Sequence, residues 1–213
     1  FTNNVMRVYT NEDIKGVELS GAMKNVIALG VGISTGLGYG DNARAALITR
    51  GIAELARLGV AMGCNVHTFA GLAGIGDLIV TCASVHSRNR KAGYLIGQGK
   101  SMQEAMDEVQ MVVEGVYSAK AAVKLGEKYG VSLPIINKVS EVLFDGKDPK
   151  EAVNELMLRD NKAEHTALPW GEYRIAETNA DTPRSDDPNN PSPIAGSMYP
   201  AYRLPEVDNN NPD

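Results

Sequence analysis

The sequence has no excess of positive charge and very little cysteine. Its 213 residues include 21 Lys and Arg against 26 Asp and Glu, which gives a formal net charge of −5. A general nucleic-acid-binding protein needs a basic surface for the phosphate backbone, so the composition argues against that class. Two cysteines, Cys64 and Cys82, are too few for a disulfide framework, and we expect a reducing, cytoplasmic location.

Long hydrophobic runs are also absent. The longest uninterrupted run of apolar residues and glycine, residues 26–33, is far too short to cross a bilayer as a helix. The chain does not open with the charged and then apolar segment of a secretory signal, and its first residue is Phe1 rather than Met. We expect a protein without membrane insertion and with further residues upstream of Phe1.

Several motifs of catalytic and cofactor sites are missing. The glycine pairs at 30/32, 36/38 and 74/76 do not continue as the G-x-G-x-x-G turn of a dinucleotide site, and no G-x-x-x-x-G-K-[ST] loop is present. The three histidines share no ligand spacing with the cysteines, so no metal site is predicted. A serine hydrolase is not indicated either, because no G-x-S-x-G motif occurs.

What the sequence does contain is a succession of helical patterns. Apolar and small residues fill positions 17–33, which predicts a buried helix whose glycines allow close backbone packing. A second helical pattern begins at Asp41 and ends at Gly63, a natural terminator. Ser101 and Glu104 have the spacing of a capping box. Further helices are predicted at residues 117–129, 134–144 and 149–158.

The two ends of the chain differ from this helical body. Residues 6–10 alternate and are rich in β-formers, which predicts a short strand, interpreted as the last strand of a sheet that lies upstream. Seven of the ten prolines fall in residues 171–213, a segment that contains eight acidic and three basic residues. We therefore predict a mainly α fold, with a helical domain at 13–164, one residual strand within 1–12, and a disordered acidic tail at 165–213.

Lys24 stands out because it lies inside the most apolar predicted helix. No carboxylate follows or precedes it at three or four residues. It either extends its ammonium to the surface or is a desolvated amine; burial lowers the pKa of a lysine and suits it to acid–base catalysis. Asn25 follows it with both a donor and an acceptor.

Two other groups of polar residues are candidates. Asp77 and Thr81 are four residues apart and share one face of a helix, either as an N-cap with a packed neighbour or as partners for a lysine or substrate hydroxyl. Ser87, Arg88 and Asn89 open a basic segment that is either a solvated first turn or an anion site at a helix N-terminus.

The order of these motifs resembles the NAD(P)-dependent glycerol-3-phosphate dehydrogenase family, in its bacterial form. The matching segments are Val8-Tyr9-Thr10-Asn11, Gly16-Val17-Glu18-Leu19, Lys24-Asn25-Val26-Ile27-Ala28, residues 36–42, Leu47-Ile48-Thr49-Arg50-Gly51, Gly71-Leu72-Ala73-Gly74-Ile75-Gly76-Asp77-Leu78, Thr81-Cys82, Ser87-Arg88-Asn89 and Val113-Glu114-Gly115. The resemblance runs from Phe1 to about Glu164. It implies the helical substrate domain of the 6-phosphogluconate dehydrogenase C-terminal type, with the N-terminal dinucleotide-binding domain missing.

The resemblance also implies roles for individual residues. Lys24 would be the acid–base group, assisted by Asp77 and Thr81. The substrate, dihydroxyacetone phosphate or glycerol 3-phosphate, would be bound by Lys24 and Asp77 together with Asn25, Ser87, Arg88 and Asn89. The cofactor, NAD or NADP, would be contacted by Arg88, Val112 and Glu114. Family members are cytoplasmic, many are homodimers, and they supply glycerol 3-phosphate for phospholipid synthesis.

Two rival interpretations remain. A related hydroxyacid or sugar-acid dehydrogenase would share the helical domain, although Lys24-Asn25 together with Ser87-Arg88-Asn89 argues against it. A non-catalytic helical module for phosphate binding or dimerisation would explain the missing glycine-rich loop. The acidic tail is not part of the family pattern, and the preference between NADH and NADPH is not encoded in these residues.

Overall fold

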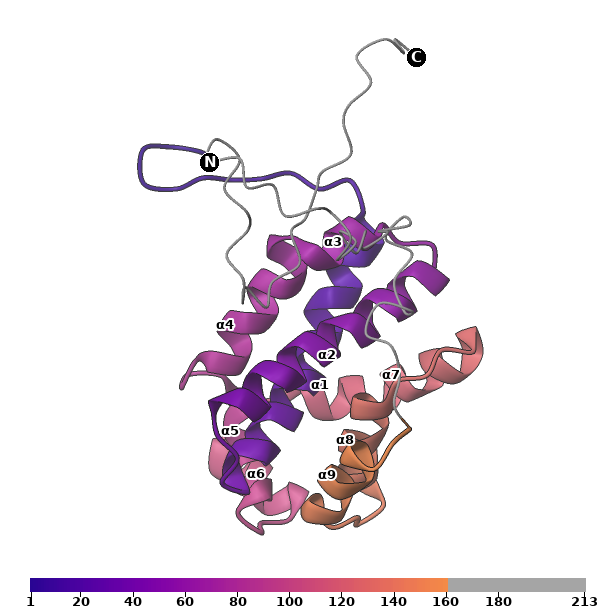
Figure 1. The fold of residues 1–213 in the computed structure, drawn as a ribbon. Coiled ribbons are helices and arrows are strands. Elements are labelled where there is room, and N and C mark those ends of the chain that lie inside the picture. The colour runs from indigo at the N-terminus through magenta and orange to yellow at the C-terminus, as the bar shows by residue number, and fades with distance from the viewer. Residues whose placement is uncertain (161–213) are drawn as a thin grey trace, which may run out of the picture. The chain divides into compact units, whose positions relative to one another are not determined.

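A computed structural model describes residues 1–160 of the chain, in which helices follow one another with short connections (Figure 1). The elements are α1 (Ile14–Gly36), α2 (Asp41–Ala61), α3 (Val66–Ala70), the π-helix η1 (Leu72–Gly76), α4 (Asp77–Ala83), α5 (Arg88–Gly97), α6 (Met102–Val109), α7 (Glu114–Tyr129), α8 (Pro134–Phe144) and α9 (Pro149–Met157). The predicted mainly α fold is confirmed. The predicted acidic tail and its boundary at 164/165 lie outside the described residues.

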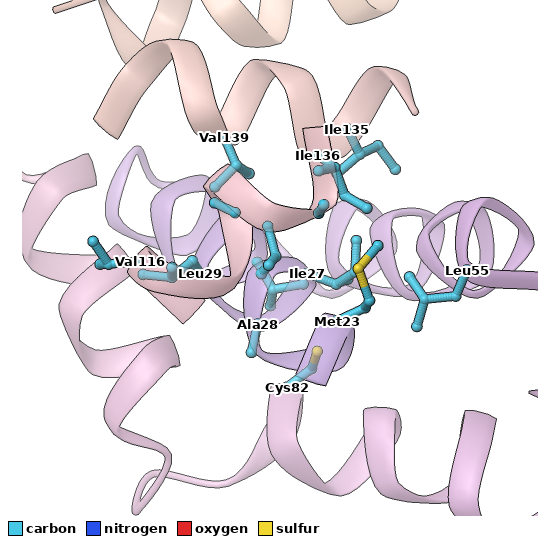
Figure 2. Close-up of a cluster of buried hydrophobic side chains, with 14 of the residues drawn as sticks. Met23, Ile27, Ala28, Leu29, Leu55, Cys82, Val116, Ile135, Ile136 and Val139 are labelled. Carbon is cyan, nitrogen blue, oxygen red and sulfur yellow. The ribbon is translucent and has the colours of Figure 1, made fainter. Parts of the chain in front are cut away.

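Helix α1 is the centre of the fold, because it packs against α2, α4, α5, α7 and α8. Its residues 25–34 are all buried, as expected for a helix that is apolar on every side. Figure 2 shows side chains of α1 meeting those of four other helices: Met23, Ile27, Ala28 and Leu29 of α1, Leu55 of α2, Cys82 of α4, Val116 of α7, and Ile135, Ile136 and Val139 of α8. A polar group within this buried stretch, such as Asn25, is therefore surrounded by closely packed side chains.

Glycines let α1 and α5 approach backbone to backbone. A Cβ placed on Gly93 would collide with the carbonyl oxygen of Leu29, and one placed on Gly97 would collide with that of Ile33. Of the glycines predicted to allow close backbone packing in the helix at 17–33, Gly32 does so against Arg90, whereas Gly30 meets side chains of α8 and Gly21 meets nothing within 4 Å. Gly36, beyond the predicted helix, also lies against the α5 backbone. One turn towards the N-termini of the two helices, Asn25 of α1 and Asn89 of α5 both lie against Gly115 of α7. The glycine seam therefore aligns two of the predicted site segments.

Local signals placed most helix ends correctly. The capping box at Ser101 is present, with Glu104 bonded back to the Ser101 backbone, and α8 has the predicted bounds with Pro134 in its first turn. Gly63, with a φ of 83°, ends the α2 segment. The predicted helix at 117–129 begins earlier, at Glu114, because the start of α7 is fixed by tertiary contacts rather than by a cap of its own.

Two predictions about local structure were wrong. Residues 6–10 form no strand, because a strand needs a hydrogen-bonding partner and the part of the chain that the structure describes contains none. Asp77 is not an N-cap: the helical backbone already runs through η1, so Asp77 is the first residue of α4 and Gly76 precedes it in αR conformation.

A buried glutamate fixes the start of α8. Glu54 of α2 is 1% exposed, and its carboxylate accepts the backbone N–H of Ile135 at 2.8 Å and of Ile136 at 3.3 Å. Leu133, which precedes α8, offers no side-chain cap, so Glu54 serves that purpose from another helix. Burial raises the pKa of Glu54 to about 7, although the two N–H groups oppose the shift.

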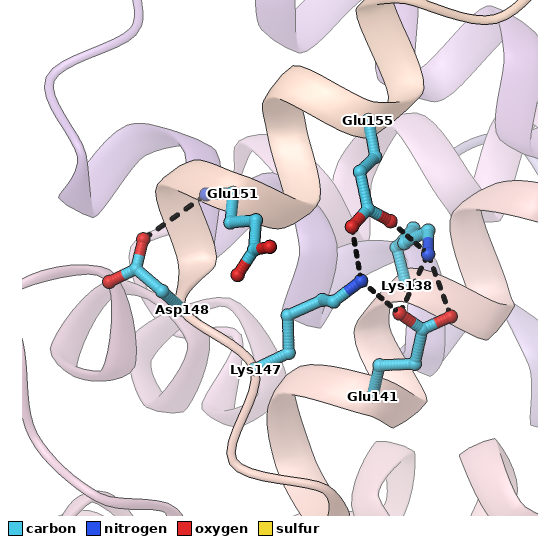
Figure 3. Close-up of polar contacts among 6 residues, drawn as sticks. All are labelled: Lys138, Glu141, Lys147, Asp148, Glu151 and Glu155. Carbon is cyan, nitrogen blue, oxygen red and sulfur yellow. Dashed lines mark hydrogen bonds and ion pairs between the residues drawn. The ribbon is translucent and has the colours of Figure 1, made fainter.

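A cluster of four charges joins α8 to α9 (Figure 3). Lys138 and Lys147 each pair with both Glu141 and Glu155, with the Lys147 ammonium 2.8 Å from Glu141 and 2.5 Å from Glu155. Hydrogen bonds from the lysines lower the pKa of both glutamates, and the glutamates raise the pKa of Lys147. The cluster ties α9 to α8.

Candidate functional site

Lys24 and Asp77 form an ion pair between α1 and α4. The Nζ of Lys24 contacts Oδ2 of Asp77, and the hydroxyl of Thr81 donates to the other carboxylate oxygen at 3.3 Å. The side chain of Lys24 is 20% exposed and that of Asp77 37%. Lys24 is therefore neither an unpaired amine nor a free surface cation. Its carboxylate partner lies 53 residues away in sequence, so local spacing alone did not identify it.

The π-helix η1 sets the position of Asp77. Its five residues lead directly into α4, and π turns of this kind are rare and frequently occur at functional sites. Gly74 lies against the backbone of Phe69, where a Cβ would collide with the Phe69 carbonyl oxygen. The turn thus needs glycine, and it presents the first residue of α4 towards α1.

The beginning of α5 supplies the second half of the site. Ser87 is its N-cap, and its hydroxyl accepts the N–H of Arg90 at 3.3 Å, as the sequence predicted for a helix start. Asn89 is 5% exposed, and its side-chain oxygen accepts the N–H of Gly115 at 2.8 Å. Because that bond uses the side-chain oxygen of Asn89, the N–H groups of its amide are the ones left to donate to another partner.

Glu114, the first residue of α7, connects the two halves. One carboxylate oxygen accepts from Nη2 of Arg88 at 3.4 Å, and the other accepts from the amide of Asn25 at 3.1 Å. Asn25 itself is 6% exposed. The residue after Glu114 is held closely, because a Cβ on Gly115 would lie 2.6 Å from the backbone oxygen of Asn25.

These residues surround one pocket of about 470 Å³. Of the residues that the sequence singled out, its lining contains Lys24, Asn25, Thr81, Ser87, Arg88, Asn89 and Glu114. Asp77 is not part of the lining and contacts the pocket through Lys24. Val112 does not line it either; its side chain is 60% exposed on the segment before α7.

Sequence reasoning missed four lining residues: Gly21, Val80, Ser84 and His86. Ser84 and His86 lie in the connection between α4 and α5, where the Ser84 hydroxyl accepts the backbone N–H of His86 at 3.1 Å. Their position directly before the predicted anion site was the one available signal. Gly21 is one turn before Asn25, so the face of α1 that carries Lys24 predicted its proximity.

The pocket combines an ammonium, a guanidinium, amide and hydroxyl donors, and one carboxylate. Such a set suits a small polar anion, since guanidinium and helix N-terminal N–H groups both favour phosphate. Cys82 lies on α4 between the pocket residues, but burial raises the pKa of its thiol to about 12, so it is not a nucleophile near neutrality. Within residues 1–160 no group of His, Cys, Asp or Glu is arranged to hold a metal ion.

Among the helices of the same range, none combines the length and the hydropathy needed to cross a bilayer.

Comparison with known proteins identifies the source of this arrangement. Residues 13–154 match the family described as NAD-dependent glycerol-3-phosphate dehydrogenase C-terminus. A glycerol-3-phosphate dehydrogenase [NAD(P)+] of Agathobacter rectalis is 64% identical over 170 residues, which cover 80% of this chain and 51% of the relative. The corresponding protein of Fusobacterium nucleatum is 63% identical and is covered to 49%. The chain thus spans about half the length of these curated relatives.

Solved structures agree with the sequence matches. The crystal structure of glycerol-3-phosphate dehydrogenase from Coxiella burnetii superposes with a TM-score of 0.72 at 42% identity, over 74% of this chain and 49% of that one. A Plasmodium falciparum glycerol-3-phosphate dehydrogenase superposes with a TM-score of 0.62 at 22% identity, over 69% and 43% of the two chains, which shows the shared fold.

Proposed function

We propose a function from the family to which the chain belongs, the NAD-dependent glycerol-3-phosphate dehydrogenases, whose C-terminal domain it matches. In this proposal the chain supplies the substrate pocket for the interconversion of dihydroxyacetone phosphate and sn-glycerol 3-phosphate. The observation that carries the proposal is one pocket lined by both Lys24 and Arg88. An acid–base group and an anion-binding group are what a small phosphorylated ketone or alcohol requires at its two ends. The product would serve phospholipid synthesis, in a cytoplasmic enzyme that is a homodimer.

The phosphate group is assigned to the start of α5. Arg88 provides a charge-assisted donor, Ser87 and Asn89 provide a hydroxyl and an amide, and Asn25 adds a second amide from α1. Asn89 is the most firmly oriented of these, since its bond to the Gly115 N–H fixes which end of its amide faces the pocket. The glycine seam between α1 and α5 keeps both sets of donors in register.

Lys24 is assigned to the reacting carbon. In the direction of reduction its ammonium gives a proton to the carbonyl oxygen of dihydroxyacetone phosphate, and in the reverse direction its amine takes the proton of the C2 hydroxyl. Asp77 holds the ammonium towards the pocket from α4, and the Thr81 hydroxyl holds Asp77 in turn. This chain of contacts orients Lys24 without occupying the pocket itself.

The cofactor, NAD or NADP, is assigned to the open side of the pocket. When bound, its nicotinamide supplies the hydride to C2 or accepts it. Arg88 and Glu114 have side chains 37% and 54% exposed, and a guanidinium and a carboxylate fit the phosphates and ribose hydroxyls of a dinucleotide. Val112 adds an exposed apolar contact. The fit covers only one end of the cofactor, because the glycine-rich turn for the pyrophosphate is not among these 213 residues.

A hybrid enzyme tests this function. The chain would be joined to the N-terminal half of the Agathobacter rectalis relative, and oxidation of reduced cofactor would be followed at 340 nm with dihydroxyacetone phosphate. We expect turnover by the hybrid and none by the 213-residue chain alone, since the cofactor must be held against the substrate carbon. An inactive hybrid that is folded and binds cofactor would contradict the proposal.

A second candidate is a non-catalytic phosphate-binding module, favoured by the absent nucleotide loop. It predicts that the same hybrid binds glycerol 3-phosphate without turnover. The domain division at residues 12/13 and 164/165 belongs to the proposal as well.

A further inference from the structure

Glu114 occupies two of the donors that the pocket would offer to an anion, Arg88 and Asn25. Its carboxylate accepts from Arg88 and from Asn25, at 3.4 and 3.1 Å, and Glu114 is itself a lining residue. Among the residues that line the pocket, Glu114 is the one carboxylate. The pocket therefore contains an anion of its own, placed on the groups that recognise phosphate.

The backbone of Glu114 is fixed, while its side chain has room to move. The next residue, Gly115, donates to the buried Asn89 and lies against the backbone of Asn25, so the first turn of α7 cannot shift without disturbing α1 and α5. The side chain of Glu114 is 54% exposed, and that of its partner Arg88 is 37% exposed. Rotation about the side-chain bonds would carry the carboxylate to solvent without opening a buried cavity.

We infer that Glu114 is an internal competitor of the substrate phosphate, which must displace its carboxylate from Arg88 and Asn25 on binding. The amide nitrogen of Asn25 already donates to Glu114 and to the Gly21 carbonyl oxygen, so it has no N–H left for a phosphate while Glu114 is bound. A phosphate on Arg88 would also lie against the Glu114 carboxylate, and two anions in contact repel each other. Displacement frees Glu114 to face the open side of the pocket. This inference rests on the function proposed above, since it assigns the phosphate to Arg88 and Asn25.

The expected size of the effect is moderate. Ion pairs between partly exposed side chains are weak, so the carboxylate is displaced at small cost. Loss of the competing carboxylate should therefore tighten phosphate binding by roughly two- to fivefold, a range that follows from the usual strength of such pairs.

Binding of sn-glycerol 3-phosphate to the 213-residue chain tests the inference. The ligand would be titrated into isotope-labelled protein while the backbone amide signals of the α5 start are followed by NMR. The variant Glu114→Gln keeps the side-chain length and removes the charge. The control Glu127→Gln removes the same charge from an exposed residue of the same helix that does not line this pocket. The Gly115 amide signal reports whether the start of α7 stays in place.

We expect Glu114→Gln to lower the dissociation constant by about two- to fivefold, Glu127→Gln to leave it within about 1.5-fold, and the Gly115 signal to persist in both. Equal or weaker binding by Glu114→Gln would overturn the inference, and so would equal tightening by both variants, which would show a net-charge effect. Arg88→Ala judges the proposed function separately: it should abolish binding in either background. If Arg88→Ala binds as well as wild type, the phosphate assignment itself is wrong.

Discussion

Lysine–carboxylate pairs occur both in the pocket and at the α8–α9 end, and the two regions use them differently. In the α8–α9 cluster, Lys138 and Lys147 each contact the same two glutamates, so every charge has two opposite neighbours. In the pocket, Lys24 pairs with one carboxylate, that of Asp77, which does not line the cavity. Lys24 itself does line the cavity. The cluster is closed, while the pocket keeps donors for a ligand. The functional region is distinguished by a lysine with a single carboxylate partner, rather than by the presence of charge.

The largest expected effect is on turnover, when a lysine of the pocket and a lysine of the α8–α9 cluster are replaced in turn. In the hybrid enzyme, Lys24→Ala should lower turnover by about 10²–10⁴-fold, the usual contribution of a positioned acid–base group. Lys138→Ala, which removes a lysine from the closed cluster, should leave turnover within a factor of about two, since it does not approach the pocket. The measurement is the initial rate at 340 nm under saturating cofactor. Equal losses in both variants would mean that Lys24 is structural.

The next effect concerns the helix packing beneath the pocket. Gly93→Ala places a methyl group against the Leu29 carbonyl oxygen and should reduce the free energy of unfolding by about 1–3 kcal/mol or more, as overpacking does. Gly21→Ala is the matched control, because a Cβ there meets nothing within 4 Å and alanine favours a helix. Urea unfolding followed by circular dichroism gives both values. A Gly93→Ala protein as stable as wild type would show that the seam can open.

The pH dependence of the free energy of unfolding tests the role of Glu54, which caps the start of α8. The pKa of Glu54 is raised from 4.5 to about 7, so the folded state takes up its proton more readily than the unfolded state. Its contribution to stability is therefore complete below pH 4.5 and is lost as the pH rises through 7, by at most about 3 kcal/mol. In Glu54→Gln this decline should disappear. Unfolding at pH 5 and pH 8, in wild type and variant, measures the difference; parallel profiles would contradict the assignment.

The smallest effect is expected in the α8–α9 cluster. Lys147→Ala should lower Tm by only about 1–3 °C at low salt, and by less at high salt, because ion pairs that solvent still reaches are weak and screened. Differential scanning calorimetry at two salt concentrations suffices. A larger loss that does not respond to salt would mean that the cluster supports packing rather than charge pairing.

Sequence reasoning succeeded where the determinants are local. The box at Ser101 follows from two residues three positions apart, and the start of α8 was indicated by Pro134 itself, although Glu54 of α2 completes that helix end. The partners of the α1 glycines, in contrast, lie on α5 and were not identified. The short helix α3 and the π-helix η1 were not predicted, because an element of five residues is too short to show a periodic pattern, and η1 also contains two glycines. The strand at 6–10 was wrong because pairing depends on a partner distant in sequence.

The site shows the same division. Ser87 as a helix cap was a local inference, and it holds. The pair of Lys24 with Asp77 joins positions 53 residues apart, and the bridge from Glu114 to Asn25 joins positions 89 apart, so spacing along one helix gave no access to either. Their place in one pocket was expected from the family resemblance, and the chemical roles remain proposals.

The glycine seam between α1 and α5 has a consequence for suppressor genetics. A bulky substitution in a core is often rescued by a second mutation that shortens the side chain with which it collides. Such a rescue is open to Gly30, because a Cβ at this position would meet a methyl group of Val139. At Gly93 and Gly97 the obstructing atoms are backbone carbonyl oxygens, which no second-site mutation can remove. A selection for revertants of an alanine at either position should thus return glycine codons, whereas one at Gly30 should also return smaller residues at position 139.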